Sequence, residues 1–236
     1  MPRRLTFEES LRTIDEQLLA AGLTGEKMLA LSMEALTSPQ ESLVREIIGP
    51  YEDQMDELEL QLEHECAVVL ATQQPTASDL RLIMSALRIA GDLERVGDYC
   101  VDVAKASRQL ESEAFPEVMA DLRQMPAICL NMLQLSIEAF RELDIESAER
   151  VGVMDKDIDR LYKRCKRMLM STLERSPELT ETGLELVLIA RYFERIGDHI
   201  TNIAERVIYT GEGRLRQLTR RPAPEDAQTH PDFLED

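Results

Sequence analysis

Apolar residues recur at spacings of three and four along most of the chain. This spacing places them on one face of an α-helix, so the pattern predicts helices rather than strands. The last predicted helix shows the pattern most clearly, with alternating steps of three and four through Leu186, Ile189, Phe193, Ile196, Ile200 and Ile203. The predicted helices cover residues 5–37, 41–73, 77–111, 117–143, 145–175 and 180–210.

Glycine and proline interrupt three of these predicted helices. Gly22 and Gly25 weaken the first helix, which we expect to be bent or broken there. Gly49 and Pro50 interrupt the second, so they either kink it or mark its true start. Pro126 predicts a kink in the fourth.

The chain contains an internal repeat. Residues 87–104, "LRIAGDLERVGDYCVDVA", match residues 187–204, "VLIARYFERIGDHITNIA", at seven of eighteen positions. The stretch "EDQMDELE" from Glu52 parallels "DKDIDRLY" from Asp155. The sequence therefore predicts an all-α protein made of two tandem, structurally related three-helix bundles. The predicted division is a first repeat at 1–113, a second repeat at 114–211 and a flexible C-terminal tail at 212–236.

The composition fits a helical protein and limits its partners. Hydrophobic residues make up 44% of the chain and aromatic residues only 4%, so helix formers dominate. A net charge of −18 opposes binding to nucleic acid or to an anionic membrane surface, so any basic patch has to be local. The sequence lacks a run of about 18 apolar residues and a signal peptide, which predicts a cytoplasmic protein with no membrane insertion. The scattered cysteines are expected to be reduced packing residues.

Acidic residues form four pairs at a spacing of four, two in each repeat. On a helix this spacing turns about 40° and rises about 6 Å, so each pair projects from one face. Every pair begins directly after a residue of the apolar stripe, so all four flank the core in the same way. The pairs are Glu52 with Asp56, Glu94 with Asp98, Asp155 with Asp159, and Glu194 with Asp198.

Like charges at this spacing repel, so a positive group should compensate them. Neighbouring arginines on a solvated face are one solution. A metal ion is the other, because hard divalent and ferric cations prefer clusters of carboxylate oxygens. Asp102 and Asn202 continue the pattern one turn further on and join the candidate metal ligands. Gly97 and Gly197 also lie inside these helices, where glycine is less stabilising than alanine. Tight packing against a neighbouring helix would explain why glycine is present there.

These motifs resemble the PhoU family of bacterial phosphate-signalling regulators. That family combines two tandem three-helix bundles with a repeated acidic E/D-x-x-x-D motif, which stands here at the four acidic pairs. The turn "QPTASDLR" at 74–81, where Thr76 and Asp79 have capping-box spacing, is similar to the signature turn of the family. The resemblance covers about residues 5–210. Asp155 departs from the family pattern, which has Glu there, and Gly49-Pro50 precedes the first motif.

The resemblance implies a non-enzymatic, homodimeric, cytoplasmic negative regulator of the phosphate-starvation (Pho) regulon. Such a protein modulates phosphate uptake as an adaptor between the phosphate ABC transporter, through its PstB-type ATPase, and a PhoR-type sensor histidine kinase. Some family members bind multinuclear iron, zinc or other metal clusters at the acidic motifs. Iron, zinc, manganese and magnesium are therefore the expected ions, and no catalytic residue is predicted.

Two other functions remain open at this point. A carboxylate-bridged metalloenzyme on a helical bundle is the alternative, since such sites perform oxygen and hydrolytic chemistry. The ferritin-like form needs the motif Glu-x-x-His. None of the three histidines, His64, His199 and His230, has a glutamate three residues before it. A helical scaffold without ion or signalling role is the third possibility, and it predicts that removing single acids is neutral or slightly stabilising.

Overall fold

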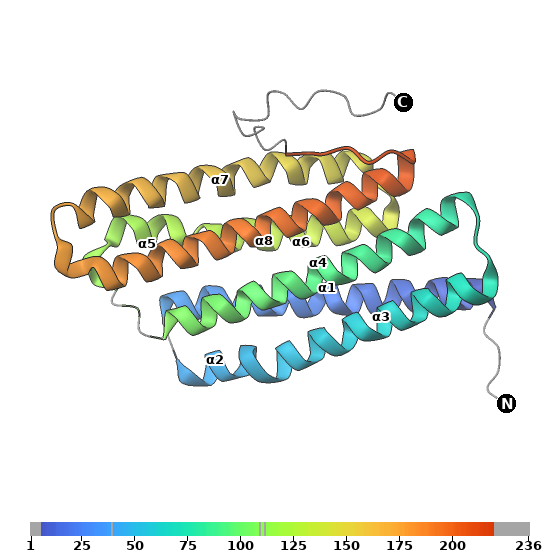
Figure 1. Ribbon diagram of the computed structural model, residues 1–236, viewed down its shortest axis with the longest axis horizontal. Coiled ribbons are helices and arrows are strands. Elements are labelled where there is room, and N and C mark those ends of the chain that lie inside the picture. Colours follow the sequence, from blue (N-terminus) through green and yellow to red (C-terminus); the bar gives the residue numbers. More distant parts are fainter. Residues whose placement is uncertain (1–5, 39, 109, 111, 220–236) are drawn as a thin grey trace, which may run out of the picture.

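The computed structural model describes residues 6–38, 40–108, 110 and 112–219, and helices dominate throughout (Figure 1). No strand occurs in these residues. The six long helices are α1 (Phe7–Thr37), α3 (Glu52–Gln73), α4 (Ala77–Ser107), α6 (Met125–Glu142), α7 (Ile145–Leu173) and α8 (Thr180–Glu212). The short elements are α2 (Glu41–Glu46), the π-helical turn η1 (Ile47–Tyr51), η2 (Ser112–Ala114), α5 (Pro116–Leu122) and η3 (Pro177–Leu179).

The long helices form two three-helix bundles that share one apolar core. The first bundle contains α1, α3 and α4, and the second contains α6, α7 and α8. Helices α4 and α8 run in opposite directions and pack against each other in the middle of the molecule, while α1 packs against α6 (Figure 1). Buried Leu, Ile and Met side chains from both bundles belong to a single cluster. The predicted fold class, two tandem three-helix bundles, is confirmed.

Helix α1 is continuous, so of the two predicted alternatives, a bend or a break at its glycines, the break is wrong. The glycines instead allow α6 to approach closely. A Cβ atom at Gly22 would lie 3.0 Å from Cγ1 of Ile137, and one at Gly25 would lie 3.3 Å from Cδ2 of Leu133. Both distances are too short for an ordinary carbon contact, so larger residues at these positions would push the two helices apart.

The interruptions in the second and fourth predicted helices are real but differ in form. Pro50 lies in the π-helical turn η1, which joins α2 to α3. Proline has no backbone N–H to donate, and the regular α-helical hydrogen bonding is interrupted at this turn. In the fourth segment the chain breaks after Leu122, and Pro126 lies in the first turn of α6, a position that tolerates proline. The break therefore precedes the proline on which the prediction was based.

The capping box expected from the spacing of Thr76 and Asp79 does not form. Thr76 is the N-cap residue of α4, but its side chain makes no capping hydrogen bond. A complete capping box instead starts α1. There the Glu9 backbone N–H donates to Oγ1 of Thr6 at 3.3 Å, and the Thr6 N–H donates to Oε2 of Glu9 at 2.8 Å.

The four cysteines, Cys66, Cys100, Cys129 and Cys165, are buried and unpaired, as predicted for packing residues. Burial raises the pKa of the Cys66 thiol to about 11 and keeps it protonated at neutral pH.

The chain turns back along α7 after α8 ends. Gly213 caps α8 with a left-handed backbone, at φ 74°. Arg216 forms an ion pair with Glu149, and Leu218 lies on Gly152, where a Cβ atom would approach it to 2.7 Å. Of the predicted tail at 212–236, residues 220–236 lie outside the described residues.

Candidate functional site

The packing of the last two long helices in each bundle brings the acidic pairs together. In the first bundle α3, which carries Glu52 and Asp56, packs against α4, which carries Glu94 and Asp98, and the charge of Asp98 acts on Glu52. We call these four residues the first acidic cluster. In the second bundle α7 and α8 place Asp155 and Asp159 beside Glu194 and Asp198, and the charge of Asp198 acts on Asp155. These four form the second acidic cluster.

The second acidic cluster is the more deeply buried of the two. Only 5% of Asp155 is exposed, and burial, together with the nearby charges of Asp198, Asp159 and Glu194, raises the pKa of its carboxyl to about 7. Gly197 makes room for this carboxylate, since a Cβ atom there would lie 2.9 Å from Oδ1 of Asp155. The predicted tight packing at this glycine is confirmed, and the group packed against it is itself an acid.

Glu194 contributes a buried oxygen without a hydrogen-bonding partner. Burial is the main cause that raises the pKa of this carboxyl, and Asp198 adds to it. Its Oε1 lies 2.5 Å from Nη1 of Arg191, but its buried Oε2 accepts no hydrogen bond from the residues that the structure describes. An acceptor left in this state is costly and is suited to receive a cation or a water molecule.

The first acidic cluster is more open and includes an acid that the sequence analysis missed. Burial raises the pKa of Glu94 to about 7, and the charges of Asp98 and Glu59 add to the rise. Burial also raises the pKa of Glu59 itself. The repeat alignment contained the signal, because it pairs Glu59 with Tyr162 and so shows an extra acid in the first repeat only.

Arginines compensate both clusters. Arg95 donates to Oδ2 of Asp98 at 2.8 Å, and Arg195 donates to Oδ2 of Asp198 at 3.0 Å, so the two repeats use the same arrangement. The guanidinium of Arg191 also lies 5.7 Å from the centre of the Tyr162 ring. The first solution predicted from the sequence, compensation by neighbouring arginines, is therefore present in the structure.

Asp102 and Asn202 occupy different environments, although the repeat alignment makes them equivalent. Asp102 lies with Glu52, Asp98 and Lys105 around an open cleft of about 320 Å³, beside the first acidic cluster. The amide of Asn202 instead donates to Oδ1 of Asp92 on α4 at 3.0 Å. The structure therefore brings Asp102 to the predicted site, whereas Asn202 is engaged between α4 and α8.

The clusters supply the right atoms for a hard cation but not a finished coordination shell. Carboxylate oxygens are the ligands that Mg²⁺, Mn²⁺ and ferric ions prefer, and Oε2 of Glu194, which accepts no hydrogen bond from the described residues and lies 3.9 Å from Nε of Arg195, fits such a role. Within the described stretches, however, no three His, Cys, Asp or Glu side chains are already arranged to hold an ion. Arg191 and Arg195 now pair with acids that a cation would use, so binding an ion requires these side chains to move.

These features define a class of protein, a doubled three-helix bundle with an acidic cluster between the last two helices of each bundle. The chain belongs to the PhoU family, because the model of the PhoU domain matches residues 18–107 and again residues 122–207. Each match covers one of the two bundles. The resemblance inferred from the acidic motifs is thereby confirmed.

Relatives and solved structures agree with this assignment. A "phosphate-specific transport system accessory protein PhoU homolog" of Clostridium acetobutylicum is 32% identical over 91% of this chain and 98% of its own length. A homologue of the same name from Pseudomonas aeruginosa is 35% identical over 88% of this chain and 86% of its own length. The crystal structure of PhoU from Pseudomonas aeruginosa superposes with a TM-score of 0.84 at 35% identity, and covers 89% of this chain and 100% of that one.

A second solved structure is the phosphate transport system regulatory protein PhoU from Streptococcus pneumoniae. It superposes with a TM-score of 0.82 at 28% identity, over 89% of this chain and 99% of that chain. Among the described helices, none has the length and apolar character needed to cross a membrane.

Proposed function

We propose that this protein is a regulatory accessory protein of a phosphate transport system and that it acts in the cytoplasm by binding other proteins. The observation that carries the proposal is the doubled PhoU domain, which occupies both bundles. The names of the relatives support it, since they describe accessory proteins of phosphate-specific transport. The relative from Clostridium acetobutylicum is matched over 98% of its length, so the similarity extends over nearly all of that protein.

In its specific form, the proposal is a negative regulator of the phosphate-starvation regulon. The protein would act as a homodimer that links a PstB-type transporter ATPase to a PhoR-type histidine kinase and restrains both uptake and kinase signalling when phosphate is plentiful. Binding rather than catalysis is supported by the names of the relatives and by the arginines that engage the acids of both clusters.

Deletion of the gene in its native host tests the regulatory role. Under phosphate excess, we expect the deletion to raise alkaline phosphatase activity and transcription of the phosphate transporter, and the wild-type gene supplied in trans should restore repression. Unchanged expression in the deletion strain would count against the proposal. Direct binding is tested by mixing the purified protein with the transporter ATPase and with the kinase and measuring complex formation.

We also propose that the two acidic clusters bind divalent or ferric ions such as iron, zinc, manganese or magnesium. The buried Oε2 of Glu194 supports this, as does the charge that acids on one helix exert on acids of the other, Asp98 on Glu52 and Asp198 on Asp155. The ligands would be the four acids of each cluster, with Asp102 beside the first.

Elemental analysis of protein purified without chelator tests the metal proposal. We expect two or more equivalents of one metal in the wild type and a loss in an Asp98→Ala/Asp198→Ala variant. Glu16→Ala/Glu41→Ala is the matched control, because both acids are exposed and pair with arginines outside the clusters. Negligible metal in the wild type, or equal metal in all three proteins, would overturn the proposal.

A further inference from the structure

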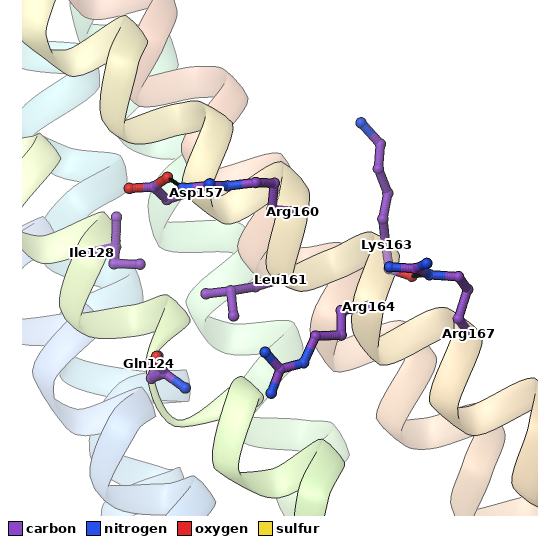
Figure 2. Close-up of a pocket in the computed structure, with 8 residues that line it drawn as sticks. All are labelled: Gln124, Ile128, Asp157, Arg160, Leu161, Lys163, Arg164 and Arg167. Carbon is purple, nitrogen blue, oxygen red and sulfur yellow. Dashed lines mark hydrogen bonds and ion pairs between the residues drawn. The ribbon is translucent and has the colours of Figure 1, made fainter.

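Helix α7 carries a basic surface that meets the second acidic cluster where Lys163 pairs with Asp159. In a chain of net charge −18, residues 156–175 contain seven lysines and arginines against three acids. Part of this surface lines a groove of about 570 Å³ between α6 and α7, shown in Figure 2. We call it the basic groove, and its lining residues are Gln124, Ile128, Asp157, Arg160, Leu161, Lys163, Arg164 and Arg167.

The basic groove combines an apolar floor with incompletely neutralised cations. Ile128 and Leu161 are partly buried apolar residues of the floor, and Figure 2 shows the Arg164 side chain reaching from α7 toward Gln124. Arg164 pairs with the buried Asp121, and Lys163 pairs with Asp159.

Arg167 is the unneutralised cation of the groove. Its Nε donates only to a backbone carbonyl, and no carboxylate in the described part of the chain pairs with it. A surface of this kind fits an acidic segment that also carries apolar side chains.

The chain beyond α8 already runs along α7 toward the groove. From residue 216 to residue 218, its contact on α7 advances from Glu149 to Gly152. The Leu218 N–H donates to Oε1 of Glu205 at 2.8 Å, which holds the segment in place.

The face of α7 that carries Glu149 and Gly152 leads to two cations at the edge of the groove, whereas the floor residue Leu161, nine residues after Gly152, lies about 180° around the helix. Lys163 lies eleven residues after Gly152, about three helical turns, and Arg167 lies eighteen residues after Glu149, about five turns. Both cations therefore lie on the face of α7 that residues 216–218 already follow. Arg164 lies twelve residues after Gly152, about 18 Å along the helix.

The sequence after residue 219 has the chemistry that the groove fits. Residues 225–236 contain five acids, and three of them flank the apolar pair in "DFLED", residues 232–236. Fourteen residues separate Leu218 from Asp232, which reach at most about 46 Å at about 3.3 Å per residue. This reach exceeds the distance to Arg164 more than twofold, so the segment is long enough to enter the groove of its own chain.

We propose that residues 225–236 dock in the basic groove of the same chain. Phe233 and Leu234 lie on the apolar floor at Ile128 and Leu161, and the flanking acids face Lys163 and Arg167. The groove is thus a docking site for acidic segments with an apolar pair, and its own chain occupies it until a competing acidic partner displaces the segment. This inference goes beyond the regulatory role and does not depend on metal binding.

A fluorescent reporter tests the docking in the full-length protein. The chain contains no tryptophan, so Phe233→Trp introduces a single indole at the proposed contact. The groove variant adds Lys163→Glu and Arg167→Glu and keeps Arg164, whose partner Asp121 is buried. The control adds Arg12→Glu and Arg45→Glu, which change the net charge equally at exposed positions on α1 and α2.

With the groove intact, we expect blue-shifted emission and an acrylamide quenching constant lower by about twofold than in the groove variant, because the docked indole is shielded from solvent. The charge control should behave like the protein with the intact groove. At 1 M salt, where the Debye length is about 3 Å, the difference should shrink. Circular dichroism establishes that all three proteins are folded.

Two results would overturn the inference. Equal emission and quenching with the intact groove and in the groove variant would show that the segment does not dock there. A blue shift that appears only as protein concentration rises would assign the contact to the segment of a second copy rather than to the same chain.

Discussion

At the scale of single residues, Gly197 shows how closely the second acidic cluster is packed. Its Cβ position lies 2.9 Å from Oδ1 of Asp155, whereas the equivalent position at Gly97 lies 3.3 Å from Cγ of Met55, a flexible side chain. We expect Gly197→Ala to lower the free energy of unfolding by about 1–3 kcal/mol, because a buried carboxylate must move. Gly97→Ala should cost less. Urea denaturation of both variants checks this, and an equal effect would contradict the difference in packing.

The raised pKa of Asp155 predicts how stability depends on pH in chelator-treated protein. Its pKa is about 7 in the folded state against 3.8 for an unperturbed aspartate, so between these pH values the folded protein holds a proton that the unfolded chain releases. The stabilisation from this proton is complete below about pH 4 and is lost as the pH rises through 7.

We therefore expect Asp155→Asn to raise the free energy of unfolding at pH 8 by about 1–3 kcal/mol and to have little effect at pH 4. Urea denaturation midpoints at both pH values measure this. Asp157→Asn, on an exposed part of the same helix, is the control and should keep the wild-type dependence. An unchanged pH dependence in Asp155→Asn would assign the effect to other groups.

At the scale of helices, the sequence predicted what depends on local periodicity and missed what depends on neighbours. Helix α8 was predicted at 180–210 and spans Thr180–Glu212, because its apolar stripe is regular. The glycines of α1 were misread as a break, because their role is set by Ile137 and Leu133 on α6, more than 100 residues away.

The candidate site divides in the same way. The four acidic pairs and the nearby arginines could be predicted from spacing, because both follow from the helical repeat. The deeper burial of Asp155 and the engagement of Asn202 with Asp92 could not, since both depend on which helices meet. Glu59 could have been found from the alignment of the repeats, but it lies outside the four acidic pairs on which the prediction of the site was based.

The close approach of α1 and α6 predicts an energetic coupling between Gly22 and Ile137. In Gly22→Ala the new methyl group lies 3.0 Å from Cγ1 of Ile137, so this substitution should be destabilising despite the higher helix propensity of alanine. In an Ile137→Ala background the clash disappears. A double-mutant cycle should therefore give a coupling of about 0.5–1.5 kcal/mol.

Gly22→Ala combined with Leu36→Ala is the control for this cycle. The two positions lie fourteen residues apart on α1, about 21 Å, so their effects should add within about 0.5 kcal/mol. If the changes in the free energy of unfolding were additive in both cycles, Gly22 and Ile137 would not be coupled. Helix α6 would then move away from α1 without loss of stability.

At the scale of the whole molecule, the two repeats meet as two copies of one unit. His199 Nδ1 on α8 lies 2.9 Å from Oδ1 of Asp92 on α4, and the Tyr99 and Tyr192 rings lie 6.0 Å apart. In the alignment of the repeats, which are offset by 100 residues, Asp92 corresponds to Tyr192 and His199 corresponds to Tyr99. The two contacts therefore join equivalent positions of the two repeats. The contacts between α4 and α8 are thus related by an approximate two-fold axis, as in a symmetric dimer whose subunits are joined in one chain.

This shared interface predicts that the two bundles unfold together. Leu62 on α3 is fully buried in a core cluster that spans both bundles, so Leu62→Ala should lower the free energy of unfolding by about 2–5 kcal/mol. A single urea transition should persist, and native-state hydrogen exchange should show lower protection in α7 and α8 as well as in α3. Leu60→Ala, at a position 65% exposed on the same helix, should change stability by at most about 0.5 kcal/mol. Loss of protection confined to the first bundle, or a second transition, would show that each bundle is stable without the other and that the interface between α4 and α8 joins two independently folding units.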